Sequence, residues 1–125
     1  MQLTRYTDYS LRILIYLALL PKDEKANVDK ISQVYGISRN NVNKIVHQLG
    51  KSGIIETKRG KGGGFYLARN PNQINVGEMV VLTENNLQVI DCEKPTCKIL
   101  PACTLKGILA QATASFINTL KQYSL

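Results

Sequence analysis

Three cysteines lie close together in the second half of this 125-residue chain, and they are the residues best suited to chemistry. Cys92, Cys97 and Cys103 are spaced Cys-x4-Cys-x5-Cys, and the chain contains no other cysteine. Three thiols within twelve residues make a poor disulfide framework because one thiol remains unpaired. Neighbouring thiolates repel one another and are stabilised by a bound cation or cluster. The pattern favours metal or cluster ligation, or redox sensing, over three small buried hydrophobic residues.

The kind of metal centre depends on the spacing and on a fourth ligand. Structural zinc normally uses tightly paired cysteines and a fourth protein ligand, and the gaps here are wider. Iron–sulfur clusters tolerate wider gaps because the iron atoms lie apart, and substitutes sometimes replace a cysteine ligand. The only histidine, His47, falls on a predicted helix of the first half, where we expect it to be solvated or to face a phosphate. The cysteines therefore favour an iron–sulfur cluster, and a cluster-free thiol sensor with reversible disulfides is the alternative.

Positive charge is concentrated in the other half of the chain. Residues 1–70 contain 12 Lys and Arg against 5 Asp and Glu, whereas residues 71–125 contain 4 of each, so the formal charge of +7 belongs to the first half. Such an excess favours a polyanionic partner, nucleic acid in particular. We therefore expect a DNA-binding domain over residues 1–70, and a cysteine-containing loop with a dimerisation helix over residues 71–125.

The apolar pattern of the first half predicts three helices followed by a β-hairpin. The expected helices span residues 4 or 7 to 20, 29–35 and 39–52, and the expected strands span residues 54–58 and 64–68. The first helix is rich enough in apolar residues to be buried on most sides, and Pro21 ends it. On the second helix, Ile31, Val34 and Tyr35 are expected to face inward. Gly36 supplies the turn before the third helix, and Ser38 caps that helix. This order predicts a winged helix-turn-helix, a mainly α fold with a small β wing.

The third predicted helix and the hairpin tip carry side chains suited to nucleic acid. Beside one apolar stripe, the helix surface holds polar and basic residues, namely Asn40, Asn43, Lys44, His47 and Lys51. Amide and basic groups can pair with base edges in the major groove. The glycine-rich tip lets the backbone approach a phosphate chain, and Arg59 and Lys61 add charge there. Either feature alone could be an ordinary solvated surface, but together with the charge imbalance they predict a DNA-binding protein.

The second half is expected to contain two helices. A short helix over residues 76–82 is capped by Asn75, with Glu78 completing a capping box. After an irregular segment over residues 84–103, a helix over residues 104–123 carries an apolar stripe made of Leu105, Leu109, Ala112, Phe116, Leu120 and Tyr123. The stripe could fold back on its own chain or pair with a second copy. Because proteins that read DNA grooves usually act as two-fold dimers, we expect a homodimer.

The sequence lacks the signals that are typical of several other classes of protein. No run of about 18 apolar residues is present, so we expect no membrane-spanning helix. The apolar segment 13–20 has no signal-peptide cleavage site after it, which favours a cytoplasmic location. No base–nucleophile pair supports an enzyme or a cluster-assembly scaffold, and Asp91 and Glu93 are the only carboxylates near the cysteines. We therefore expect no enzymatic activity.

Nearly the whole chain resembles the Rrf-type iron–sulfur transcriptional regulators. The segments that carry the resemblance are 1–4 with 6–9, 35–40, 46–49, 59–64 and 101–103, which read MQLT with YTDY, YGISRN, VHQL, RGKGGG and PAC. Within this family the cysteine spacing is similar to that of the nitric-oxide-sensing repressors. Members with a two-iron centre have five residues in both gaps and a histidine three residues after the last cysteine, where this chain has Lys106.

The resemblance implies a homodimeric repressor that binds double-stranded operator DNA and holds an iron–sulfur cluster on Cys92, Cys97 and Cys103, with a four-iron cluster favoured and a two-iron cluster as the alternative. It implies that Asp8 from the second subunit completes the cluster, although an acidic residue there could simply favour the start of a helix. It implies that nitric oxide is the signal, and that nitrosylation of the cluster releases the operator; another iron–sulfur or redox sensor of the same family is the alternative. It further implies DNA contacts at Ser38, Arg39, Asn40, Asn43, Lys44, Arg59, Lys61 and Gly62.

Overall fold

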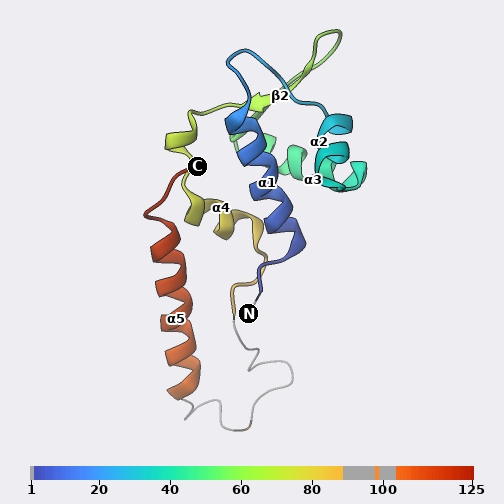
Figure 1. Cartoon of the computed structure of the whole chain (residues 1–125). Helices are drawn as coiled ribbons and strands as arrows, with labels where there is room; N and C mark the ends of the chain where they lie inside the picture. The colour runs from blue at the N-terminus through green and yellow to red at the C-terminus, as the bar shows by residue number, and fades with distance from the viewer. Residues whose placement is uncertain (1, 89–97, 99–103) are drawn as a thin grey trace.

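The computed structural model describes residues 2–88, 98 and 104–125, and this part of the chain is mostly helical with one antiparallel β-hairpin (Figure 1). The elements in chain order are α1 (Arg5–Leu19), α2 (Val28–Tyr35), α3 (Arg39–Lys51), β1 (Ile55–Lys58), β2 (Gly64–Leu67), the short 3-10 helix η1 (Pro71–Gln73), α4 (Val76–Thr83) and α5 (Thr104–Leu120). The predicted fold class, a winged helix-turn-helix followed by a C-terminal helix, is confirmed.

Local sequence signals set the ends of the helices that matter for function. Ser38 Oγ accepts a hydrogen bond from the Asn41 amide at 3.2 Å, and Asn75 Oδ1 accepts one from the Glu78 amide at 3.0 Å, so both predicted caps are present. Gly36 has φ 66°, in the left-handed region that favours glycine. That conformation allows the tight turn that sets α3 against α2.

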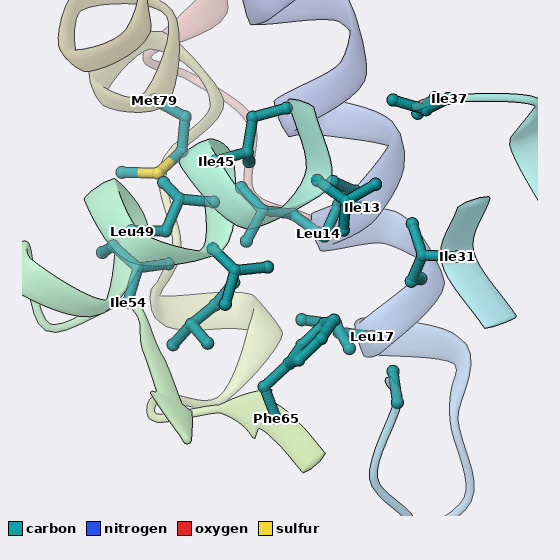
Figure 2. Packing of buried hydrophobic residues seen from close by; sticks show 14 of the residues in the cluster. Ile13, Leu14, Leu17, Ile31, Ile37, Ile45, Leu49, Ile54, Phe65 and Met79 are labelled. Carbon is teal, nitrogen blue, oxygen red and sulfur yellow. The ribbon is translucent and has the colours of Figure 1, made fainter. Parts of the chain in front are cut away.

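One hydrophobic core fixes α3 relative to the hairpin (Figure 2). Side chains from six elements meet in it, including Ile13 and Leu14 of α1, Ile31 of α2, Ile45 and Leu49 of α3, Ile55 of β1, Phe65 of β2 and Met79 of α4. Full burial of a large aliphatic side chain stabilises a fold by about 1.5–3 kcal/mol. The core continues past residue 70, since Ile74 and Met79 belong to it.

The loop before α2 is attached to the hairpin. The Ala26 amide donates to the Phe65 carbonyl, and the Phe65 amide donates to the Ala26 carbonyl, both at 2.9 Å. A Cβ on Gly64 would lie 2.4 Å from the Ala26 carbonyl oxygen, so only glycine permits this approach. Strand β2, at the base of the wing, is therefore hydrogen-bonded on both sides, to β1 and to the segment around Ala26.

The exposed apolar side chains bear on two sequence-based expectations. The expectation that α1 is buried on most sides is confirmed, because the exposed residues of this helix, among them Ile15 and Leu19 at 46% and 80%, lie along one narrow stripe. Helices α3 and α4 and strand β2 contact α1, and only this stripe is uncovered in the single chain. Val34 of α2, which its position in the pattern suggested would face inward, is also largely exposed.

Helix α5 stands apart from the rest of the chain over most of its length (Figure 1). Ile117 is its only buried residue, whereas Leu105, Ile108 and Phe116 of its apolar side chains are exposed. The helix ends at Leu120 rather than at Tyr123, because the following residues turn back onto the start of α4. There the Val76 amide donates to the Tyr123 carbonyl at 3.0 Å. None of the described helices has the length and apolar character required to span a bilayer.

Candidate nucleic-acid interface and cysteine site

Helix α3 has a buried stripe and an exposed polar face. Val42, Ile45, Val46 and Leu49 are buried in the core. The predicted DNA-contacting residues of this helix, Asn40, Asn43 and Lys44, are exposed, as is His47. The helix is therefore anchored by one side and presents amide and basic groups on the other, as a helix in a major groove must.

Two of the predicted residues at the start of α3 make contacts of their own. The hydroxyl of Ser38 caps the helix, so this side chain has a structural role. The Arg39 guanidinium pairs with the Asp29 carboxylate of α2 at 3.0 Å, and both side chains are about 70% exposed. An exposed pair contributes little stability, so Arg39 remains able to exchange Asp29 for a phosphate or a base.

The wing tip is shaped by glycines. Gly60 and Gly62 have φ values of 91° and 74°, and the Gly63 amide closes the turn on the Gly60 carbonyl at 2.9 Å. A Cβ on Gly63 would lie 2.3 Å from the Lys58 carbonyl oxygen, so the turn has no room for a side chain there. The tip is thin and exposed, and its side chains Arg59 and Lys61 extend from it into solvent.

A groove lies between α3 and the wing. It is lined by Asn43, Lys44, Val46, His47, Thr57 and Arg59. The structure thus brings together three predicted contact residues, Asn43 and Lys44 of α3 and Arg59 of the hairpin, that are distant in sequence. Lys61 and Gly62 lie beyond the groove at the tip.

Sequence reasoning missed Thr57 and gave His47 no definite role. The signal for Thr57 was available, because alternate residues along a strand share a face and Thr57 lies two residues before Arg59. Both Thr57 and His47 line the groove. A threonine hydroxyl and an imidazole can each donate a hydrogen bond to a phosphate oxygen.

The three cysteines lie outside the described residues, so the predicted cluster loop is not among the parts of the chain that the structure places. Within residues 2–88, 98 and 104–125, no group of three or more His, Cys, Asp and Glu side chains could hold a metal ion. The donor set is therefore judged by its chemistry. Three thiolates with an added carboxylate suit iron, which accepts both kinds of ligand.

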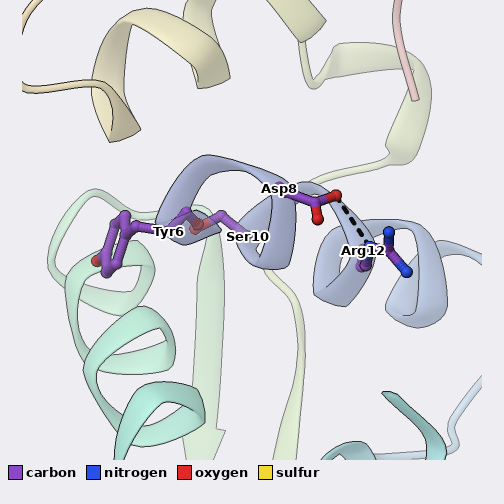
Figure 3. A network of polar contacts seen from close by, with 4 residues as sticks. All are labelled: Tyr6, Asp8, Ser10 and Arg12. Atoms are coloured by element: carbon purple, nitrogen blue, oxygen red, sulfur yellow. Dashed lines mark hydrogen bonds and ion pairs between the residues drawn. The ribbon is translucent and has the colours of Figure 1, made fainter. Parts of the chain in front are cut away.

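Asp8 is the one predicted ligand that the structure describes. It lies in the first turn of α1, where its Oδ1 accepts a hydrogen bond from Arg12 Nε at 2.9 Å. This bond raises the pKa of Arg12 above its ordinary value. The Asp8 side chain is 48% exposed and lies on the opposite side of α1 from Tyr6 (Figure 3). Its carboxylate can therefore be reached from outside the subunit, as a ligand supplied to a second copy must be.

The start of α1 is tied to the end of α4. Glu84 accepts hydrogen bonds from the Thr4 amide at 3.2 Å, from the Thr4 hydroxyl at 3.0 Å and from the Thr7 hydroxyl. Thr7 is completely buried, and the Thr83 hydroxyl donates to it at 3.0 Å. Asp8 directly follows Thr7, so its position depends on the end of α4.

The fold and the exposed polar groove define this chain as a winged helix-turn-helix regulator. Residues 3–125 match the Rrf2 family, described as iron-dependent transcriptional regulators. The chain belongs to this family, and it is a DNA-binding transcriptional regulator and not an enzyme.

Curated relatives match over nearly the full length of the chain. The HTH-type transcriptional regulator NsrR of Shouchella clausii is 50% identical over 127 residues, which cover 99% of this chain and 85% of that protein. NsrR of Bacillus subtilis is 42% identical over 128 residues, covering 100% of this chain and 88% of that protein. The resemblance to the Rrf-type family seen in the sequence is confirmed.

Two solved structures have the same fold at low identity. T. potens IscR superposes with a TM-score of 0.79 at 20% identity, over 99% of this chain and 82% of that one. The oxidised form of Staphylococcus aureus CymR gives a TM-score of 0.79 at 19% identity, over 99% of this chain and 92% of that one. At this level of identity the likeness shows the fold alone.

Proposed function

We propose that this chain is a homodimeric, cytoplasmic transcriptional repressor that binds operator DNA and releases it in response to nitric oxide. The observation that carries DNA binding is the groove in which Asn43 and Lys44 of α3 meet Arg59 of the wing. The support for the signal comes from the full-length relatives named NsrR together with the cysteine spacing that the chain shares with nitric-oxide-sensing repressors.

In this proposal helix α3 and the wing have separate roles in DNA binding. Asn40, Asn43 and Lys44 read base edges, with Ser38 and Arg39 at the start of the helix, while Arg59, Lys61 and Gly62 contact phosphates or the adjacent minor groove. Phosphate contacts set the register and base contacts set the sequence preference. Residues 1–70 supply this surface, and residues 71–125 supply the sensing loop and the dimer helix.

The sensing part holds an iron–sulfur cluster, a four-iron cluster in preference to a two-iron one, on Cys92, Cys97 and Cys103. When bound, the cluster supplies iron atoms that react with nitric oxide. Asp8 from the second subunit completes the ligand set, and Arg12 orients its carboxylate through the bond at 2.9 Å. Because Asp8 lies on α1 and α1 packs on α3, a ligand taken from the second subunit constrains the spacing of the two reading helices.

Dimerisation in this proposal uses α5. The exposed Leu105, Ile108 and Phe116 leave an apolar helix surface without a partner in the single chain. Such a surface is stabilised when a second copy covers it. Two paired subunits then present two α3 helices to successive major grooves, about one helical turn of DNA apart.

Anaerobic reconstitution followed by native mass spectrometry and a gel shift tests the proposal. The expected result is a dimer that carries one cluster per subunit, binds operator tightly, and loses that affinity on exposure to nitric oxide. The variant with all three cysteines replaced by Ser is expected to bind no iron and to give no response. Equal operator affinity with and without the cluster would contradict the proposal, because a ligand shifts an equilibrium only by its differential affinity for the two states. A colourless protein with reversible thiol loss would support the cluster-free redox sensor.

A further inference from the structure

One side-chain amide joins α3 to both α1 and α4. Gln48 Nε2 donates to the Leu82 carbonyl at 3.3 Å, and Gln48 Oε1 accepts a hydrogen bond from the Tyr6 hydroxyl. Gln48 and Tyr6 are half-buried, and burial raises the pKa of Tyr6, so its hydroxyl keeps the proton that it donates. Among the described residues, Gln48 is the only side chain of α3 that is hydrogen-bonded to α4.

The same end of α4 holds the start of α1 through Glu84 and Thr83, which bond to Thr4 and Thr7. Leu82 and Glu84 precede Cys92 by ten and eight residues in the sequence. The last turn of α4 is thus the last described helical turn before the cysteines, and it is hydrogen-bonded to two of the three helices of the DNA-binding part, α1 and α3.

We propose that Gln48 is a positioning residue that couples the last turn of α4 to the DNA-reading helix. A displacement at the end of α4 moves the Leu82 carbonyl, and Gln48 must then follow it or lose this bond. Either outcome changes how α3 is set between α1 and the wing, and therefore how well Asn43 and Lys44 meet a groove. The inference deepens the proposed function and rests on it in one respect, namely that the cysteine segment supplies the displacement.

Replacement of Gln48 by Met tests the coupling with little change in volume. Methionine fills a similar space and cannot donate to Leu82 or accept strongly from Tyr6. The control is Gln33→Met, on an exposed position of α2 with no side-chain hydrogen bond in the described structure. In the wild-type protein the ratio of operator affinities between cluster-loaded and cluster-free forms is measured first. Gln48→Met is expected to reduce this ratio about fivefold, the size of one net hydrogen bond, and Gln33→Met is expected to leave it unchanged.

A second readout needs no cluster. Coupling between two sites is reciprocal, so DNA bound at α3 must also affect the end of α4. Hydrogen exchange of cluster-free protein is followed with and without excess operator at low salt, where electrostatic contacts maintain binding. DNA is expected to slow amide exchange at residues 80–84 in the wild type and in Gln33→Met, and to do so much less in Gln48→Met. Equal slowing in all three proteins would overturn the inference.

The outcomes separate this inference from the proposed function. If the cluster has no effect on operator affinity but DNA slows exchange at the end of α4 in the wild type and in Gln33→Met and much less in Gln48→Met, the sensing proposal fails and the coupling stands. If the cluster changes operator affinity in the wild type and the affinity ratio of Gln48→Met equals the wild-type ratio, the coupling is wrong and sensing stands. Tyr6→Phe, which removes only the donated hydroxyl, provides a milder variant should Gln48→Met fail to fold, and the same equality would count against the coupling.

Discussion

Arg59 and Asn40 represent the two kinds of side chain on the proposed DNA-binding surface. Arg59 extends from the wing and lines the groove next to α3, whereas Asn40 is exposed in the first turn of α3. A guanidinium at a phosphate contributes to binding at any sequence, while an amide at a base edge contributes at particular base pairs. Replacement of the two residues should therefore affect DNA binding in different ways.

Arg59→Ala is expected to weaken binding to all DNA sequences by a similar factor. Loss of one phosphate contact should also reduce the slope of log affinity against log salt concentration by about 0.9. Fluorescence anisotropy titrations at several salt concentrations measure both quantities. Lys121→Ala, which removes the same charge near the end of α5, is the matched control and should leave the slope unchanged. A loss of affinity confined to the operator would show that Arg59 reads bases instead.

Asn40→Ala is expected to relax sequence preference while binding to random DNA changes little. One amide contact to a base edge is worth about 1–3 kcal/mol of discrimination. Competition against a set of operators with single base-pair changes measures this, and the preference should flatten at one or two positions only. The control is Asn72→Ala, an exposed asparagine of η1. A uniform loss across all sequences would place Asn40 at the phosphates.

At the residue scale, local chemistry could be predicted from the sequence and pairings between distant residues could not. The caps at Ser38 and Asn75 follow from residue type and position, because each cap bonds an amide three residues along. The Asp29–Arg39 pair and the bonds of Gln48 join separate elements, and no spacing rule predicts them. The cysteines and the role of Asp8 remain predictions, since ligation depends on a loop outside the described residues and on a second subunit.

At the scale of elements, the contact between α4 and α5 depends on one glycine. A Cβ on Gly77 would lie 2.7 Å from the Lys121 amide nitrogen and 3.0 Å from the Ile117 carbonyl oxygen. Gly107 of α5 has no neighbour within 4 Å of such a Cβ and is not at a positive φ. Replacement of each glycine by alanine therefore tests one crowded position and one open position in the same protein.

Gly77→Ala is expected to destabilise the protein by about 1–3 kcal/mol, because the added methyl group forces α5 away from α4. Gly107→Ala is expected to be neutral or to stabilise by up to about 1 kcal/mol, since alanine favours a helix and meets no atom there. Urea unfolding followed by circular dichroism measures both changes. Equal stability of the two variants would show that α4 and α5 separate readily.

The helical periodicity predicted which elements form, but it did not predict which faces are covered. The order of helices and strands was recovered because caps, turn glycines and apolar spacing all agree for α2, α3 and the hairpin. The burial of Val34 was overestimated because an exposed apolar residue can have the same spacing as core residues. The end of α5 was placed too late, since the return of residues 121–125 onto α4 is a contact between distant segments.

For the whole molecule, the exposed apolar surface of α5 predicts assembly. Ile108→Asp is expected to yield a monomer, because a charge placed in an apolar contact loses its hydration without a partner. Light scattering after size-exclusion chromatography measures the mass. Val34→Asp is the control, another exposed apolar position, on α2, and it should remain a dimer. If Ile108→Asp stays dimeric and Val34→Asp does not, the subunits pair through α2.

Helix α4 is held by hydrogen bonds at both ends. At its start these are the Val76–Tyr123 and Ile74–Leu125 backbone bonds, and at its end they are the bonds of Leu82 to Gln48 and of Glu84 to Thr4. This eight-residue helix is about 12 Å long. In the proposed dimer, the pairing of α5 and the cysteine-containing segment would therefore both act on this one short helix. Under the proposed function, subunit association and sensitivity to the signal are then thermodynamically linked, and the dose of signal needed for a half-maximal response should change as the protein is diluted towards its dissociation midpoint.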